Sequence, residues 1–183
     1  MNLPLPPAFP AGEYVPPDIQ EDAQLPPWID RLEAVPARVR AQIAGLDEQQ
    51  LDTRYRNWTI RQIVHHLADS HVNCYVRCKW ALTEATPTIK SYDETAWSEV
   101  IDATTLPLES SLRILEGVHA RWAALLHLMD AKQLQRAFFH PELQREVTVR
   151  ETVPNYVWHA DHHLAQIEWV CTHHGFTREI AIE

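Results

Sequence analysis

Six of the eleven histidines of this chain lie in two short segments, HHLADSH (65–71) and HADHH (159–163). His159 and His163 are four residues apart, and on a helix this spacing puts both imidazoles on the same face, about one turn apart. Two such imidazoles can bind one metal ion. HExxH metalloproteases use the same spacing with a glutamate in second place, but the second residue here is Ala160, so that motif does not predict a protease.

The first histidine segment can supply a third ligand from a facing helix. Three protein ligands and one open position are typical of a catalytic zinc-type site. Both segments place polar residues directly beside an apolar stripe, and buried polar groups are costly unless they are paired or ligated. Spacing alone leaves open whether His65 or His66 is the ligand. The other histidines that compete for the role are His71, His119, His127, His140, His162, His173 and His174.

Apolar residues at helical spacing predict the elements that carry these segments. We expect an all-α, antiparallel four-helix bundle, with Pro36 kinking or dividing the first helix and Thr59 and Thr148 capping the second and fourth. The expected helices cover about 28–45, 60–85, 107–129 and 150–174. A short helical turn is expected at 47–51, a long connection at 86–105 and a small β-hairpin within 137–149. Residues 1–27 are rich in proline and predict an extended arm, which leaves 28–183 as the bundle domain.

The amino-acid composition indicates which classes of binding partner to expect. The net charge is −9, from 25 acidic and 16 basic residues, which disfavours nucleic acid and anionic membranes and favours a small-molecule substrate. No apolar run is long enough for a membrane span, and the first residues lack the pattern of a secretory signal, so we expect a cytoplasmic protein. Cys74, Cys78 and Cys171 are then expected to be reduced and to act as small buried apolar residues.

Several longer motifs resemble the YfiT branch of the DinB-like superfamily. They cover nearly the whole chain from about Tyr14, and the combination is specific. The matching stretches are YRNWTIRQIVHHLADSHVN (55–73), TPTIKSYDETAW (86–97), ILEGVHARW (114–122), FHPE (139–142) and YVWHADHHLAQIEW (156–169).

The resemblance implies a four-helix bundle in which His66, His159 and His163 hold one divalent ion, zinc or nickel. Members of this branch are described as metal-dependent hydrolases, and wider relatives as thiol S-transferases or isomerases that use bacillithiol, mycothiol or glutathione. Family members commonly form homodimers.

Two reactions fit such a site. An ion held by three neutral imidazoles keeps its double charge, so the pKa of bound water falls toward ~7 and a hydroxide nucleophile forms; a bound thiol would give a thiolate instead. The sequence leaves open which of these two reactions occurs. It also leaves open that the metal is purely structural, or that the protein is a helical interaction module without metal. We expect Asp161 at the surface. The candidate pocket residues are Asp69, Asn73, Arg77, Tyr92 and Trp97.

Overall fold

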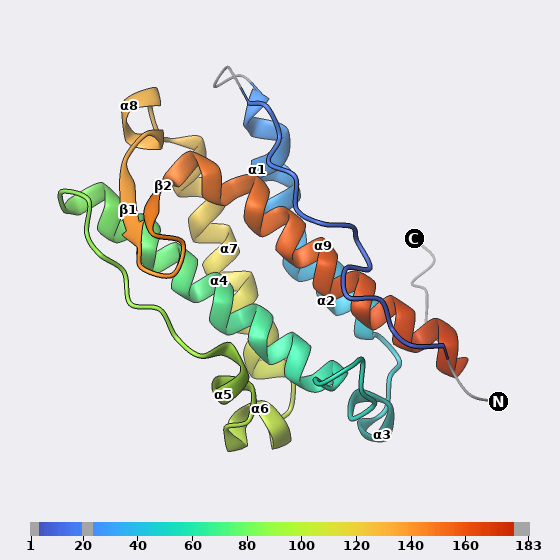
Figure 1. Ribbon diagram of the computed structural model, residues 1–183. Coiled ribbons are helices and arrows are strands. Elements are labelled where there is room, and N and C mark those ends of the chain that lie inside the picture. The colour runs from blue at the N-terminus through green and yellow to red at the C-terminus, as the bar shows by residue number, and fades with distance from the viewer. Residues whose placement is uncertain (1–3, 20–23, 178–183) are drawn as a thin grey trace.

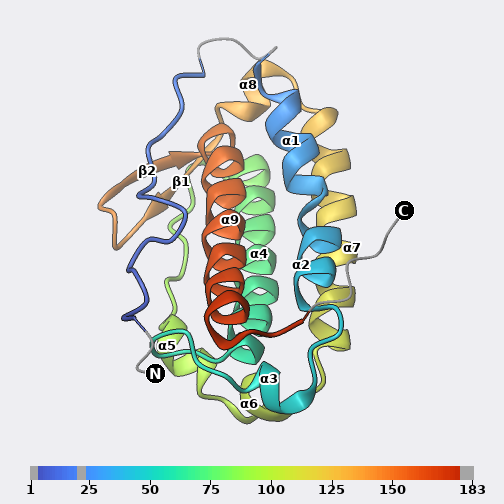
Figure 2. The same ribbon diagram turned by 90° about the vertical axis from the view of Figure 1, so that its right-hand side faces the viewer.

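The computed structural model describes residues 4–19 and 24–177, and it confirms the predicted four-helix bundle. One column of the bundle consists of two short helices placed end to end, and the other three are single long helices (Figures 1 and 2). The columns are α1 (Pro26–Glu33) with α2 (Val35–Ile43), α4 (Ile60–Thr83), α7 (Glu109–His127) and α9 (Val149–His174).

The two longest helices begin and end at the residues expected from capping chemistry. Thr59 forms a capping box with Gln62 at the start of α4, and Thr148 forms one with Glu151 at the start of α9. Gly175 closes α9 with a φ of 69°, a left-handed conformation that glycine adopts without steric cost. Because both ends of α9 are fixed in this way, the side of the helix on which its histidines lie is fixed as well.

Pro36 divides the first column, as the sequence predicted. In a continuous helix the N–H of residue 36 would donate to the carbonyl of Leu32, but proline has no N–H. α1 therefore ends at Glu33, and α2 starts beyond Ala34. The break leaves the Leu32 carbonyl without its usual intrahelical donor.

The connection after α4 returns the chain along the outside of the bundle (Figure 2). We expected a long connection with about one helical turn, and it contains two short helices, α5 (Glu94–Ser98) and α6 (Ile101–Thr105). Because of this return, α4 and α7 run in the same direction, whereas α4 and α9 run in opposite directions. The bundle therefore has two parallel contacts, α4 with α7 and the first column with α9, in addition to its antiparallel ones.

The predicted hairpin consists of β1 (Ala137–His140) and β2 (Arg145–Thr148), paired antiparallel from Ala137 opposite Thr148 to His140 opposite Arg145. It is joined to the crossover by the Ile89 N–H, which donates to the Phe139 carbonyl at 3.1 Å. The remaining elements are α3 (Glu48–Leu51), where a helical turn was expected, and α8 (Ala131–Leu134), which was not predicted.

Residues 4–19 form an irregular strap along α9 (Figure 1). The Trp158 indole N–H donates to the Gly12 carbonyl at 3.1 Å, and the rings of Tyr14 and Trp158 lie 5.5 Å apart. The division into 1–27 and 28–183 stays a prediction. Parts of it (1–3, 20–23 and 178–183) lie outside the described residues, and α1 already begins at Pro26.

The core consists of two apolar clusters stacked along the bundle axis. One includes Leu67, Leu115 and Ile167, and the other includes Leu32, Trp122 and Val157. On α4 and α7 the level between the clusters is occupied by His71 and His119, which are 0 % and 1 % exposed. A polar layer thus separates the two halves of the core.

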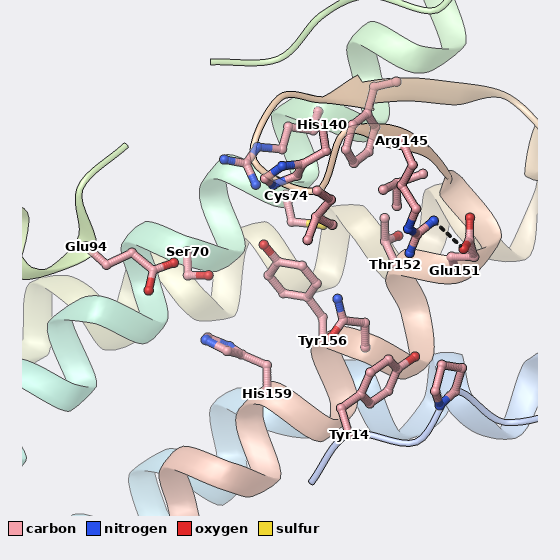
Figure 3. Close-up of a pocket in the computed structure, with 16 residues that line it drawn as sticks. Tyr14, Ser70, Cys74, Glu94, His140, Arg145, Glu151, Thr152, Tyr156 and His159 are labelled. Atoms are coloured by element: carbon pink, nitrogen blue, oxygen red, sulfur yellow. Dashed lines mark hydrogen bonds and ion pairs between the residues drawn. The ribbon is translucent and has the colours of Figure 1, made fainter. Parts of the chain in front are cut away.

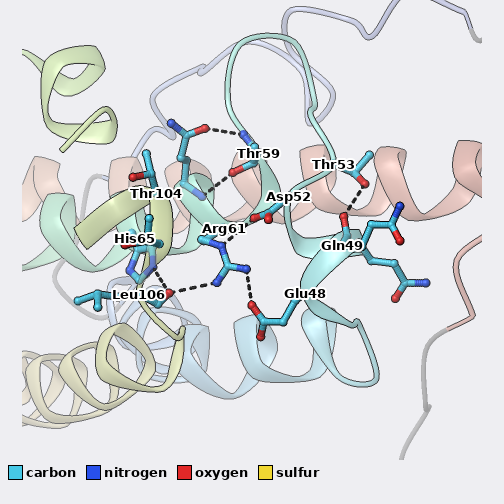
Figure 4. Close-up of polar contacts among 12 residues, drawn as sticks. Glu48, Gln49, Asp52, Thr53, Thr59, Arg61, His65, Thr104 and Leu106 are labelled. Atoms are coloured by element: carbon cyan, nitrogen blue, oxygen red, sulfur yellow. Dashed lines mark hydrogen bonds and ion pairs between the residues drawn. The ribbon is translucent and has the colours of Figure 1, made fainter. Parts of the chain in front are cut away.

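Polar contacts also tie the crossover to the start of α4. Arg61, almost fully buried, donates to Asp52 and Glu48 at 2.8 and 2.5 Å and to the Leu106 carbonyl at 3.1 Å (Figure 4). The three cysteines are buried, as expected, and no disulfide joins them. Within residues 4–19 and 24–177, no helix combines the length and apolar character that a membrane span needs.

Candidate metal centre

Three imidazoles converge between α4 and α9. The Nε2 atom of His159 lies 3.2 Å from the Nε2 atoms of both His66 and His163. The ligand atoms of all three lie within 4.8 Å of one another. A tetrahedral zinc ion with bonds of 2.0–2.1 Å separates its nitrogen ligands by about 3.3 Å. The spacing of the nitrogens therefore fits a single ion of this size.

Burial keeps these imidazoles in the neutral form that a metal requires. It lowers the pKa of His66 to about 4. The pKa values of His159 and His163 lie well below the usual histidine value, first because of burial and then because of the neighbouring histidines. At neutral pH all three rings are uncharged, so an ion can bind without first displacing their protons.

Gln166 orients one of the three rings. The His163 Nδ1–H donates to the Gln166 Oε1 at 2.8 Å, and the Gln166 amide donates to the Nε2 of His162 at 2.9 Å. With its proton on Nδ1, His163 presents the Nε2 lone pair to the other two rings. A ligand histidine usually donates its second nitrogen to a nearby acceptor in this way. The sequence analysis did not identify Gln166 in this role, although it lies three residues after His163.

His65 takes no part in the cluster. Its Nδ1 lies 2.7 Å from the Ser111 Oγ and its Nε2 3.2 Å from the Leu106 carbonyl, so the ring ties α4 to α7 and the crossover. Its neighbour on the chain, His66, points instead toward α9 and packs against Trp58 with ring centroids 4.6 Å apart. Of the two histidines that spacing could not separate, the structure brings His66 to His159 and His163.

A cavity of about 220 Å³ opens beside His159, between α4, α9 and the hairpin (Figure 3). Its lining includes the hydroxyls of Ser70, Thr152 and Tyr156 and the guanidinium of Arg77, a residue only 9 % exposed. The Arg77 Nη2 donates to the Lys90 carbonyl at 3.4 Å. Within the described residues, no carboxylate oxygen lies within 4.0 Å of this guanidinium.

The other predicted pocket residues lie elsewhere. Asn73, Tyr92 and Trp97 line a second hollow of about 460 Å³ under the crossover, where the Tyr92 and Trp97 rings lie 4.4 Å apart. Asp69 is partly buried, and its carbonyl accepts a hydrogen bond from the Asn73 amide at 2.8 Å. Burial, together with the charge of Asp102, raises the pKa of Asp69 to about 6. Only Arg77 of the five lines the cavity beside His159.

Asp161, which we expected at the surface, is only partly exposed, with 24 % of its side chain accessible, and its carboxylate accepts from Arg31 and Arg38 at 2.7 Å each. Sequence reasoning missed several residues that line the cavity. Tyr14 comes from the strap, and His140 and Arg145 come from the hairpin, where the Arg145 guanidinium contacts the Glu151 carboxylate at 2.8 Å. No helical periodicity marks these positions, because they do not lie on helices. The FHPE motif around His140 is a signal of another kind, since it belongs to the family resemblance.

The sequence profile of the DinB superfamily matches residues 31–167. The chain belongs to the DinB superfamily. The chain is 45 % identical over 162 residues to "Putative metal-dependent hydrolase YfiT" of Bacillus subtilis (strain 168). The matched region covers 87 % of this chain and 91 % of YfiT. A protein of the same description from Geobacillus thermodenitrificans (strain NG80-2) is 40 % identical over 161 residues, or 87 % of this chain and 90 % of the relative.

The solved structure of YfiT from Bacillus subtilis superimposes with a TM-score of 0.89 at 43 % identity. The match covers 93 % of this chain and 98 % of that one. Similarity over this length confirms both the predicted family and the predicted bundle. The thiol transfer considered from the sequence gains no support from these comparisons.

Proposed function

We propose that this protein is a metal-dependent hydrolase that holds one divalent ion through His66, His159 and His163. The observation that carries the proposal is the convergence of three neutral imidazoles, with the His159 Nε2 3.2 Å from the Nε2 atoms of His66 and His163. Imidazole nitrogens bind both zinc and nickel, and the proposal includes either ion. A histidine site with an open position supplies Lewis-acid activation of water when the ion is bound. The names of the relatives support hydrolysis as the reaction.

The substrate of this proposal is a small molecule with a negatively charged group. The cavity beside His159 has room for a small ligand. Arg77 is the buried charge in its wall, and a buried charge is stable when a partner of opposite sign is present. A carboxylate or phosphate on the substrate would accept from this guanidinium, while the hydroxyls of Ser70 and Tyr156 hold neighbouring polar atoms. Arg77 then orients the substrate with respect to His159.

Elemental analysis tests the metal part of the proposal. We expect about one equivalent of zinc or nickel in the purified protein, and its loss in the double variant His66→Ala/His163→Ala. His174→Ala is the matched control, since His174 is an exposed histidine on the same helix as His163. Stoichiometric metal in the double variant, or none in the unaltered protein, would contradict the proposed site.

Ester hydrolysis tests the reaction. We expect the metal-loaded protein to cleave activated nitrophenyl esters without added thiol, and to lose this activity after treatment with a chelator. The double variant controls for contaminating esterases. If turnover occurs only when a low-molecular-weight thiol is added, the site is a thiol-transfer site and the hydrolase proposal is wrong.

A further inference from the structure

A chain of buried imidazoles runs from the candidate metal centre through the bundle to a backbone carbonyl. The Nδ1 of His159 lies 3.3 Å from the Nε2 of His71. The Nδ1 of His71 lies 2.8 Å from the Nε2 of His119, and the Nδ1 of His119 lies 2.6 Å from the carbonyl oxygen of Leu32. The four residues come from α9, α4, α7 and α1, so every column of the bundle contributes one group.

The carbonyl at the end of the chain sets the direction of every hydrogen bond in it. A carbonyl oxygen only accepts, so the proton of His119 is on Nδ1. The ring is buried and neutral, so its Nε2 is bare and accepts from the Nδ1–H of His71. By the same step, the Nε2 of His71 is bare and accepts from the Nδ1–H of His159. The Nε2 of His159 is therefore left with a free lone pair, and this is the atom that faces His66 and His163.

Pro36 explains why the carbonyl at the end of this hydrogen-bond chain is available to a side chain. Since residue 36 has no N–H, the Leu32 carbonyl is available to the His119 ring instead of to the helix. The chain is a dead end for protons, because a peptide carbonyl has no proton to exchange. Its effect is orientation: three hydrogen bonds specify one tautomer and one ring position for His159 before any ion is present.

We propose that His71 and His119 are positioning residues that hold His159 in its metal-binding tautomer through a hydrogen-bond chain anchored on the Leu32 carbonyl. The proposal rests on the proposed function, because it assumes that His159 is a ligand. His119 is the better residue to test, since it lies further from the centre than His71 and its replacement leaves the three ligand side chains and His71 in place.

The tautomers of the unaltered, metal-free protein test the chain directly, and single variants serve only to assign the signals. Long-range 1H–15N correlation spectra of protein labelled at histidine distinguish a proton on Nδ1 from one on Nε2. We expect His119, His71 and His159 all to carry their proton on Nδ1, each signal being assigned by its loss in a single variant. A His159 signal with the proton on Nε2 would overturn the proposal.

Zinc affinity tests the consequence. We would titrate zinc into metal-free protein in a His127→Gln background, which removes the exposed cluster of Asp30, Glu33 and His127 as a competing site. His119→Phe interrupts the chain, and we expect it to raise the zinc dissociation constant by about 10- to 100-fold. His119→Gln keeps a donor for Leu32 and an acceptor for His71, so we expect it to recover most of the affinity.

The outcomes separate this proposal from the proposed function. If the background protein does not bind one zinc ion, the proposed metal site fails, while the tautomer spectra still decide whether the chain exists. If the background binds zinc and His119→Phe binds it equally well, the site stands and the positioning role is wrong. If His119→Phe does not fold, the comparison of His119→Gln with the background and the spectra of the unaltered protein still test the proposal.

Discussion

Acid is expected to destabilise the metal-free protein through its buried histidines. A histidine whose pKa is lowered by folding binds its proton more readily in the unfolded chain. Unfolding is therefore favoured as the pH falls below the unfolded pKa of 6.5, until the folded pKa is reached. Burial lowers the pKa of both His66 and His119 to about 4, so the sensitive window is roughly pH 6.5 to 4.

The magnitude follows from these two groups. Between pH 7 and pH 5 each loses about 2 kcal/mol of folding free energy, or about 4 kcal/mol together. His71, His159 and His163 add to the loss, since their pKa values are lowered further. Asp69 opposes it, because its raised pKa lets the folded state take up a proton near pH 6, but it is only partly buried and offsets at most about 1 kcal/mol. The net loss is a large part of the 5–15 kcal/mol typical of a domain.

Urea unfolding of chelator-treated protein at pH 7 and pH 5, followed by tryptophan fluorescence and circular dichroism, measures this loss. His119→Gln should reduce the difference between the two pH values by about 2 kcal/mol, whereas the exposed-site control His174→Gln should leave it unchanged. A free energy of unfolding that differs by less than about 1 kcal/mol between pH 7 and pH 5 would refute the reasoning. It would mean that water reaches these rings or that they are already protonated in the folded protein.

Three further predictions follow from the contacts of single residues. Arg77→Met should raise the KM for a nitrophenyl ester that carries a carboxylate by about tenfold while leaving the KM for its uncharged analogue unchanged, which steady-state kinetics on the two esters will show. Thr148→Ala removes the side-chain cap of α9 and should destabilise the protein by about 1 kcal/mol in urea unfolding, with Thr148→Ser as the control that keeps the hydroxyl. Arg61→Met should cost about 1–2 kcal/mol in the same assay, because it breaks the contacts to Asp52, Glu48 and the Leu106 carbonyl; the exposed Arg113→Met, which loses only a surface ion pair, should change stability by less than about 1 kcal/mol.

The helices were predictable because their signals are local. Thr59 and Thr148 each cap a helix by hydrogen bonding with the residue three positions further along the chain. Gly175 adopts a conformation that few other residues tolerate. The short helix α8, which was not predicted, carries the same kind of signal: Asp130 and Gln133 form a capping box before only one turn of helix. Four residues are too few for hydrophobic periodicity to appear, so only the cap could have predicted this element.

The candidate site was only partly predictable. The four-residue spacing of His159 and His163 is local, and the family resemblance selected His66. The roles of His65 and His71 depend on which helix lies opposite each face of α4, and this is decided by the crossover that brings α7 alongside α4. The cavity was missed for a similar reason, because Tyr14 and Arg145 reach it from segments without regular periodicity. The homodimer expected from the resemblance stays a prediction.

The polar layer between the two apolar clusters affects the alignment of the helices along the bundle axis. Apolar side chains pack acceptably in several alignments, so a bundle with a uniform apolar core can slide by one turn at little cost. Here a slide of α7 by one turn would carry His119 away from both His71 and Leu32 and leave buried ring nitrogens unpaired. Each unpaired nitrogen would cost about 1–3 kcal/mol. The histidines thus favour a single alignment of the four columns, whether or not an ion is bound.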